Sequence, residues 1–286
     1  MALDVALTFD DYFWAPAYAT MRSVALSTTR RKEVVFHLFH WRLAAEHRAV
    51  LDAIAAEFGA SVLHYALDAD PEIRGLIERL PGTRAFPPVV YARLLLDQLL
   101  PAGVARVLYL DCDVYVRAPV ERLFEMNLAG RTLAAAPEPG RQHLVAGDDM
   151  RTRQGPFDPA APYFNSGVLL IDRGAWGRAD LPGFLAGLAA SGELAGLYHD
   201  QDVLNLRFRD DWFALDPRWN LTKPHPALRA LDPFIVHYTT GQKPWNALAY
   251  VAFGSSYKHV MTREILRRYR RYRMGVWLRR RFGGKG

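Results

Sequence analysis

The 286-residue chain is predicted to form a single α/β domain on a mainly parallel sheet. Three observations favour this class. Short runs rich in apolar and β-branched residues alternate with longer helical patterns. Half of the residues are hydrophobic, which suffices for a packed core and excludes a disordered chain. The run 104–110 is almost continuously apolar, as expected of a strand covered on both faces.

The first quarter of the chain supplies three strands separated by helical patterns. The expected elements are a strand over 3–9, a helix over 16–28, a strand over 34–39, a helix over 43–58 and a strand over 61–66. This alternation indicates parallel strands joined by helices.

The rest of the domain continues the alternation around one irregular stretch. The expected elements are a helix over 91–100 that Pro101 ends, a strand over 104–110, a strand over 166–172, a short helix over 201–209 and a strand over 234–238. The stretch 130–162 is richer in Pro and Gly, and we expect loops and a short helix there, close to a site.

Charge is concentrated at the C-terminus. The net charge is +6, but residues 263–286 hold nine arginines, one lysine and one acid, so they carry +9 and leave −3 on residues 1–262. A mildly acidic body argues against a surface that wraps nucleic acid. We therefore divide the chain into a main domain, 1–262, and a basic tail, 263–286.

The basic tail is predicted to form an amphipathic helix. Ile265, Tyr269, Tyr272 and Val276 share one helical stripe, which Gly275 interrupts, and arginines surround it. Three further apolar residues follow, Trp277, Leu278 and Phe282. This composition suits an anionic membrane surface or a nucleic acid, and the acidic body favours the membrane. The alternative is a solvated, frayed terminus.

The sequence also indicates a compartment. Cys112 is the single cysteine, so no disulfide forms within the chain, which favours a reducing environment. The first residues include acids and no basic segment, unlike a secretory signal. No run of 18 apolar residues appears, so no membrane span is predicted. We expect a cytoplasmic protein that is peripheral on the inner face of the membrane.

The strongest local motif is a pair of acids after the predicted strand 104–110. Asp111 and Asp113 are spaced by two, so in an extended segment they point to the same side while Cys112 points away. The carboxyl ends of strands in open α/β sheets form the ligand crevice. Two carboxylates there suit Mg²⁺ or Mn²⁺ bridging phosphates, although such a pair alone is also common at strand ends without a metal.

A second cluster follows the last predicted strand. His237 would add a nitrogen ligand, which favours Mn²⁺ over Mg²⁺. Lys243, one of five lysines in an arginine-rich chain, is suited to hold a diphosphate as a point charge. Taken alone, His237 fits a surface loop beside the buried Trp245 equally well.

Taken together, six motifs in order resemble the family 8 retaining glycosyltransferases. This GT-A-fold family includes bacterial lipopolysaccharide galactosyl- and glucosyltransferases. The resemblance covers roughly residues 3–250. The matching motifs are Thr8-Phe-Asp10-Asp11-Tyr12, Tyr91-Ala-Arg93-Leu, Leu110-Asp111-Cys-Asp113, Tyr163-Phe-Asn165-Ser166-Gly167, Asp200-Gln201-Asp202 and the stretch from His237 to Trp245. It implies a GT-A (Rossmann-like) catalytic domain over 1–262.

The resemblance implies a UDP-hexose donor and a saccharide acceptor, and it assigns a role to each matched residue. Thr8, Asp10 and Tyr12 would contact the uracil and ribose, and Arg93, Asn165, Ser166 and Lys243 would contact the donor sugar or diphosphate. Asp111, Asp113 and His237 would bind Mn²⁺, with Mg²⁺ as the alternative, and Asp200 and Gln201 would be the catalytic pair. Glu138 matches an acid near the donor sugar. Thr240 stands where the family commonly has Gly, which puts the loop conformation in question.

Two other functions compete with this interpretation. A haloacid-dehalogenase-type phosphatase also places two acids after an apolar strand, and Gly147-Asp148-Asp149 imitates its later acidic motif. Against it, Tyr115 replaces the usual Thr or Val, and no Lys lies between Asp113 and Asp148. The second alternative is a nucleic-acid- or lipid-binding protein that acts through the basic tail. We favour the transferase, with a lipid-linked acceptor, no nucleic acid partner and a role in lipopolysaccharide or other surface glycan synthesis.

Overall fold

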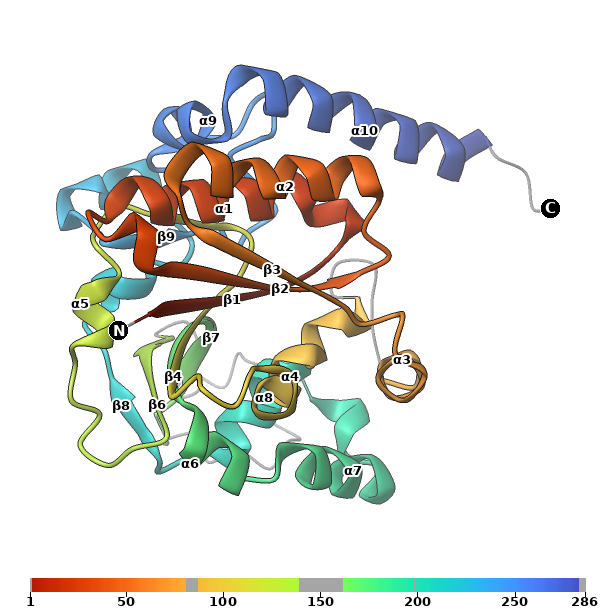
Figure 1. Cartoon of the computed structure of the whole chain (residues 1–286), viewed down its shortest axis with the longest axis vertical. Helices are drawn as coiled ribbons and strands as arrows, with labels where there is room; N and C mark the ends of the chain where they lie inside the picture. Colours follow the sequence, from red (N-terminus) through yellow and green to blue (C-terminus); the bar gives the residue numbers. More distant parts are fainter. Residues whose placement is uncertain (1, 81–86, 139–161, 198, 283–286) are drawn as a thin grey trace.

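The computed structural model describes residues 2–80, 87–138, 162–197 and 199–282, and shows a twisted sheet with helices on both faces (Figure 1). The strands are β1 Leu3–Asp10, β2 Val34–Trp41, β3 Ser61–Ala66, β4 Arg106–Leu110, β5 Val114–Val116, β6 Leu133–Pro137, β7 Phe164–Asp172, β8 Trp212–Ala214 and β9 Ile235–His237. The α-helices are α1 Trp14–Ser27, α2 Ala45–Phe58, α3 Pro71–Glu78, α4 Leu96–Leu99, α5 Glu121–Phe124, α6 Arg173–Arg178, α7 Leu181–Ser191, α8 His199–Arg207, α9 Gly254–Met261 and α10 Arg263–Phe282.

The main sheet has seven strands in the order β3-β2-β1-β4-β7-β6-β8. Strands β1 to β4 are mutually parallel, and β6 is parallel to β8, whereas β7 runs antiparallel to both of its neighbours. The prediction of a mainly parallel α/β sheet is therefore confirmed. Because β7 is reversed, its beginning lies at the same edge as the end of β4, and the amide of Asp111 donates to the carbonyl of Gly167 at 2.8 Å.

Alternate side chains of the central strands enter two separate cores. Leu108 and Leu110 of β4 pack in the core under α1, α2, α9 and α10, whereas Val107 and Tyr109 pack in the core on the opposite face. Neighbouring residues of a strand point to opposite faces, so an unbroken apolar run fits a strand that is covered on both sides.

Two predicted elements were wrong in detail. Instead of one α-helix over 91–100, a 3₁₀-helix, η3 (Pro88–Leu95), precedes the short α4. It begins at Pro88, and proline fits this position because the N–H group that it lacks would have no partner inside the helix. A 3₁₀-helix is wound more tightly than an α-helix, so the apolar spacing expected of an α-helix does not apply to it. The stretch 130–162, expected to be irregular, contains β6, whose run of three alanines carries little strand propensity but is buried between β7 and β8. Residues 139–161 lie outside the described part.

Residues 263–282 of the basic tail form one continuous helix, α10, and Gly275 does not break it, since a single helical glycine costs only about 1 kcal/mol. Ile265 and Tyr269 are buried in the core with α1 and α9, so the predicted apolar stripe faces the protein in its first turns. Trp277, Leu278 and Phe282 are exposed in the last turns. Among the described residues, no helix combines the length and apolar character that a bilayer span requires.

Acid is expected to destabilise the fold through His40 on β2. The side chain is 4% exposed, and neither ring nitrogen has a hydrogen-bond partner among the residues that the structure describes. Burial, with help from His64 and Arg48 and against Asp68, lowers the pKa of His40 to about 4. Between about pH 4 and 6.5 the unfolded chain therefore binds a proton that the folded chain excludes, so stability is full above this window and falls as the pH drops through it.

For one group the free energy of unfolding should fall by about 1.4 kcal/mol per pH unit inside this window. Urea unfolding of the wild type and of His40→Leu at pH 7 and pH 5 measures the difference. The variant should lose less stability on acidification than the wild type, whereas the exposed His259→Gln should behave like the wild type. Equal losses in wild type and His40→Leu would contradict this assignment.

Candidate active site

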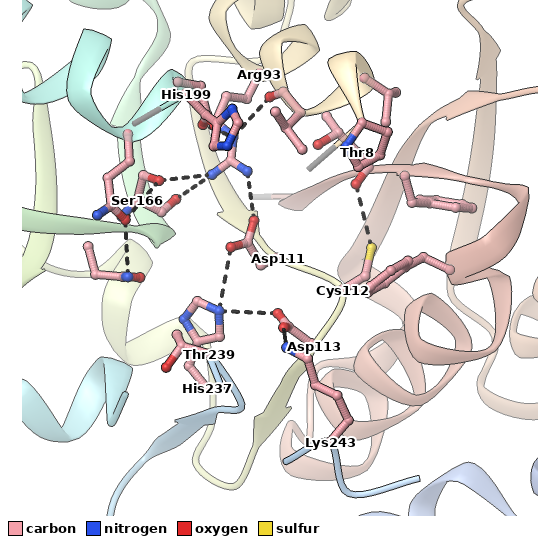
Figure 2. A pocket seen from close by; sticks show the side chains of 18 of the residues that line it. Thr8, Arg93, Asp111, Cys112, Asp113, Ser166, His199, His237, Thr239 and Lys243 are labelled. Atoms are coloured by element: carbon pink, nitrogen blue, oxygen red, sulfur yellow. Dashed lines mark hydrogen bonds and ion pairs between the residues drawn. The ribbon is translucent and has the colours of Figure 1, made fainter. Parts of the chain in front are cut away.

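A cavity of about 510 Å³ lies at the edge where β1 and β4 end and β7 begins. It brings together nearly all of the predicted site residues, from seven segments of the chain. The predicted residues that line it are Thr8, Asp10, Arg93, Asp111, Asp113, Glu138, Asn165, Ser166, Asp200, Gln201, His237 and Lys243. Many of them appear together in Figure 2, where Asp111, Asp113, His237 and Lys243 point toward one another.

Asp111, Asp113 and His237 form a group whose potential ligand atoms all lie within 4.8 Å of one another. Asp111 and Asp113 follow β4, and β9 pairs antiparallel with β5 so that His237 lies opposite Val114. His237 Nε2 is 3.1 Å from Asp113 Oδ1 and 3.5 Å from Asp111 Oδ2. Two carboxylates and one imidazole form a donor set that Mn²⁺ accepts, so the residues present fit a divalent cation.

The side chains of His237 and Asp111 occupy space beside Gly167, where any other residue would place a Cβ atom. A Cβ atom on Gly167 of β7 would lie 2.2 Å from His237 Cε1 and 2.6 Å from Asp111 Oδ2. Both distances are far below van der Waals contact, so the imidazole and the carboxylate reach their positions only because residue 167 has no side chain. Cys112 points away from the group, with its sulfur 3.7 Å from the carbonyl oxygen of Thr8, as the spacing of the two acids predicts.

Cations stabilise the charged form of the carboxylates. Lys243 Nζ donates to Asp113 Oδ2 at 2.6 Å and also to the carbonyl of Tyr238. Burial by itself raises the pKa of Asp113, but opposing interactions, of which the one with the Lys243 ammonium is the largest, hold this pKa well below its usual range. Asp113 is therefore ionised across the physiological pH range and ready to bind a cation.

Arg93 joins the acid pair to α8. Its Nη2 donates to Asp111 Oδ1 at 2.8 Å, its Nε lies 2.7 Å from Asp200 Oδ2, and its Nη1 donates to the carbonyl of Ser166 at 2.8 Å. The guanidinium also stacks over Tyr109, 4.3 Å from the ring centre. Arg93 is only 4% exposed, so its guanidinium is held inside this network of contacts.

Removal of this guanidinium should cost much of the stability. Arg93→Leu leaves the buried Asp200 and the partly exposed Asp111 without their shared cation, and breaking a buried pair such as Arg93–Asp200 costs about 3–5 kcal/mol. Arg93→Lys keeps the charge but loses the planar fork, so its cost should be smaller but still measurable. Chemical denaturation of the three proteins gives the values, and a loss below about 1 kcal/mol in Arg93→Leu would contradict the described network.

The cavity continues to a polar pocket formed by β7 and α8. Gln201 Oε1 accepts from Asn165 Nδ2 and from the amide of Ser166, each at 3.1 Å, and Gln201 Nε2 donates to the hydroxyl of Tyr163. That hydroxyl donates to Asp202 at 2.6 Å. Asp202 is fully buried and does not line the cavity itself. Because it holds the Tyr163 hydroxyl, to which Gln201 donates, it helps to orient Gln201.

Asp200 is 5% exposed and lines the cavity. Burial raises the pKa of Asp200 to about 6, with Arg93 acting against the rise and Asp111 adding to it. A buried carboxyl group next to a cavity is an acceptor for hydroxyl groups of a polar ligand.

A family model described as glycosyl transferase family 8 matches residues 4–249. The chain belongs to glycosyltransferase family 8. The prediction of this family from six ordered motifs is confirmed, and with it the prediction of an enzyme that transfers a glycosyl group. The phosphatase alternative is removed by the same finding, and its motif 147–149 lies outside the described residues.

Curated relatives cover most of the family 8 domain. General stress protein A of Bacillus subtilis is 24% identical over 258 residues, 84% of this chain and 86% of that protein. Lipopolysaccharide 1,3-galactosyltransferase of Salmonella typhimurium is 23% identical and covers 85% of this chain and 73% of its own length. Lipopolysaccharide 1,2-glucosyltransferase of Escherichia coli K12 is 28% identical over 60% of this chain and 54% of its own length.

Solved structures show the fold. Galactosyltransferase LgtC, in complex with donor and acceptor sugar analogs, superimposes with a TM-score of 0.73 at 22% identity over 91% of this chain and 95% of LgtC. The bifunctional glycosyltransferase WbbM gives 0.74 at 18% identity over 94% of this chain and 51% of WbbM. The predicted GT-A fold is confirmed.

Thr8 and Asp10, which were predicted to contact a nucleotide, line the cavity of this glycosyltransferase at the end of β1. Thr8 Oγ1 bonds the hydroxyl of Tyr109 at 2.8 Å, and Asp10 accepts from the amide of Tyr12 at 3.0 Å. Burial raises the pKa of Asp10. Tyr12 does not line the cavity, because its ring lies against α10, where Arg273 Nε donates to its hydroxyl at 3.1 Å.

Thr240 is accommodated without strain. The positive φ values among described non-glycine residues do not include Thr240, and the following Gly241 is not left-handed either. The loop therefore does not need a glycine at position 240, where the family commonly has one. Thr240 also lines the cavity.

Sequence reasoning missed several residues of the site. Lys223 and His199 line the cavity with φ values of +48° and +54°, a conformation that non-glycine residues adopt rarely and that is frequent at functional sites. The rarity of lysine in this chain was a usable signal for Lys223, as it was for Lys243. Asn220 lies behind His237, and nothing in its sequence context marks it.

Proposed function

We propose that this enzyme transfers a hexose, galactose or glucose, from a UDP-sugar to a saccharide acceptor, with retention of configuration and with Mn²⁺ as cofactor. The observation that carries the proposal is the convergence of Asp111, Asp113 and His237 on the cavity that Asp200 and Gln201 also line. Mg²⁺ is the alternative cation, and the imidazole ligand favours Mn²⁺.

The nucleotide would lie along the end of β1 with its diphosphate at the acid group. Thr8 and Asp10 would contact the uridine, with Tyr12 next to them at the contact with α10. A divalent cation held by Asp111, Asp113 and His237 would supply positive charge that stabilises the leaving diphosphate. Lys243, at 2.6 Å from Asp113, would add a second cation on the same side.

The donor sugar would occupy the polar pocket between β7 and α8. Asn165 and Ser166 would line it, Asp200 would accept from sugar hydroxyls, and Arg93 would hold Asp200 in place from behind. Glu138 lines the same pocket and accepts from Asn165 Nδ2 at 3.2 Å, so it would lie close to the sugar as well.

The side-chain amide of Gln201 favours one of two retaining mechanisms. A double displacement requires a carboxylate nucleophile beside the anomeric carbon, and an amide is a poor nucleophile. We therefore propose attack by the acceptor hydroxyl on the face that the diphosphate leaves, with a phosphate oxygen accepting its proton. Trapping of a covalent sugar on Asp200 or Asp202 would contradict this mechanism.

The acceptor is proposed to be lipid-linked and to belong to lipopolysaccharide or another surface glycan. The named activities of the lipopolysaccharide transferases among the relatives support this class. The last turns of α10, with exposed Trp277, Leu278 and Phe282 beside Arg279–Arg281, support contact with an anionic membrane surface on the cytoplasmic side. The tail, 263–286, would then act as the membrane-associating segment, although its first turns belong to the core.

A nucleotide-sugar panel tests the proposed function. Purified protein is incubated with UDP-galactose, UDP-glucose, their N-acetylated analogues and GDP-mannose, each with Mn²⁺, with Mg²⁺ and with EDTA, and release of the nucleoside diphosphate is measured. Mn²⁺-dependent release of UDP from a UDP-hexose is expected. Release of UDP that is equally fast in EDTA, or release of GDP only, would overturn the proposal.

Flotation with liposomes tests the membrane contact. Vesicles with anionic lipid should float the wild type but much less of a variant in which Trp277, Leu278 and Phe282 are replaced by serine. A matched control replaces Leu248 and Tyr250, which are 94% and 69% exposed but lie outside the basic helix. Equal flotation of wild type and the α10 variant would refute membrane contact through α10.

A further inference from the structure

A buried row of amide groups lies behind the proposed metal ligand His237. Asn220, from the 3₁₀-helix η6 (Pro217–Asn220), and Asn165, from β7, are 3% and 6% exposed. His237 Nδ1 lies 2.9 Å from Asn220 Oδ1, and Asn220 Nδ2 donates to Asn165 Oδ1 at 2.8 Å. The row continues to Glu138, which accepts from Asn165 Nδ2.

The donor and the acceptor of each hydrogen bond in this row can be assigned, starting from a backbone amide that contacts Asn165. The backbone amide of Gly167, which can only donate, lies 3.0 Å from Asn165 Oδ1. That contact sets which end of the Asn165 side chain is oxygen, and Asn165 Nδ2 then faces the acceptors Glu138 Oε2 and Gln201 Oε1. Side-chain amides are often ambiguous in orientation, but a backbone donor removes the ambiguity here.

The same logic extends to the imidazole. Because Asn165 Oδ1 is an acceptor, Asn220 must turn its NH₂ group toward it and its oxygen toward His237. An oxygen at 2.9 Å requires a hydrogen on Nδ1 of His237. In the neutral ring, Nε2 then carries the lone pair, and Nε2 is the atom that faces Asp111 and Asp113 at 3.5 and 3.1 Å.

We propose that Asn220 is a positioning residue for the metal site: it fixes the Nδ1–H tautomer and the ring orientation of His237, so that Nε2 is presented to the cation. This inference rests on the proposed metal site and adds a residue that does not touch the metal. Partners on the second nitrogen of a metal-binding histidine typically change metal affinity by about 10–100-fold. Through Asn165, the same row links the metal ligand to Gln201 in the donor-sugar pocket.

Metal titration separates positioning from packing. Mn²⁺ binding to the full-length protein, without nucleotide, is measured by calorimetry or by the loss of the free-ion EPR signal. Asn220→Ala removes the acceptor for Nδ1–H and should raise the Kd about 10–100-fold. Asn220→Asp keeps an acceptor for His237 but sets an oxygen against Asn165 Oδ1, so it should lower the Tm while it leaves the Kd within about threefold of the wild type.

Asn205→Ala is the matched control. Asn205 is also buried, at 5% exposure, and its amide holds the backbone of Phe164 on β7, but it has no contact with His237. It should lower the Tm and leave the Kd unchanged within threefold. Equal Kd values in wild type and Asn220→Ala, or an equal rise in Asn220→Ala and Asn205→Ala, would overturn the inference.

The tautomer is read directly from ¹⁵N shifts of the imidazole in the metal-free protein, with the His237 signals assigned from His237→Gln. The wild type should show the Nδ1–H form, and Asn220→Ala should shift toward Nε2–H. An Nε2–H tautomer in the wild type would overturn the inference even if Mn²⁺ binds. If the wild type binds no Mn²⁺ but shows Nδ1–H, the proposed metal site fails, and the orienting role of Asn220 survives.

Discussion

Replacement of Asp111 or Asp113 by asparagine is expected to reduce Mn²⁺-dependent UDP release by at least about a hundredfold. Each change removes one of the two carboxylates that converge with His237, and the loss of a group that stabilises developing charge costs about 10²–10³ in rate. In Asp113→Asn, Lys243 also loses the negative charge of its partner at 2.6 Å. Initial rates of UDP release at several Mn²⁺ concentrations measure the effect.

The control for this pair is Asp210→Asn, an exposed acid on the loop after α8 that lies outside the cavity. It should keep wild-type rates and wild-type Mn²⁺ dependence. Saturating Mn²⁺ should not restore either site variant if the lost carboxylate acts in the reaction as well as in binding. Full activity in Asp111→Asn or Asp113→Asn would remove the metal assignment.

Gly167→Ala is expected to disable the site without altering any residue that bears its chemistry. The new Cβ would lie 2.2 Å from His237 Cε1 and 2.6 Å from Asp111 Oδ2, so these two proposed metal ligands must move from their present positions. Overpacking of this kind costs about 1–3 kcal/mol of stability, and the Mn²⁺ Kd should rise at least about tenfold. Thermal unfolding and Mn²⁺ titration of one sample give both quantities.

Gly187→Ala is the matched control for this substitution. Gly187 lies inside α7, and nothing lies within 4 Å of the position that its Cβ would take. Alanine there should stabilise the helix by about 0.5–1 kcal/mol and leave the Mn²⁺ Kd unchanged. If Gly167→Ala binds Mn²⁺ as tightly as the wild type, the ligand geometry described for His237 and Asp111 is incorrect.

The sequence predicted most of the site because its residues stand in local patterns with a physical meaning. Asp111 and Asp113 point the same way because strand residues alternate, and they lie at a sheet edge because an apolar strand precedes them. The distant His237 was proposed as a third ligand because it follows the last predicted strand, and the family resemblance supported that assignment. The structure supplies the physical cause, which is the pairing of β9 with β5.

Other features had no local pattern to reveal them. Asn220 acts on residues 17 and 55 positions away, so only the folded chain brings the three together. The alanines of β6 carry a helix preference that the neighbouring strands override. The stripe of Ile265 and Tyr269 was visible as a pattern, but a pattern does not say whether protein or membrane covers it.

The most direct test of the proposed metal and nucleotide site is a titration of the wild-type protein with Mn²⁺ in the absence and presence of UDP. Asp111, Asp113, His237 and Lys243 line the same cavity, so cation and diphosphate should bind next to each other and strengthen each other's binding. We expect one Mn²⁺ per chain and a Kd that falls at least about fivefold when UDP is present. A protein that binds no Mn²⁺, or binds it with the same Kd in both titrations, would contradict the proposed metal and nucleotide site.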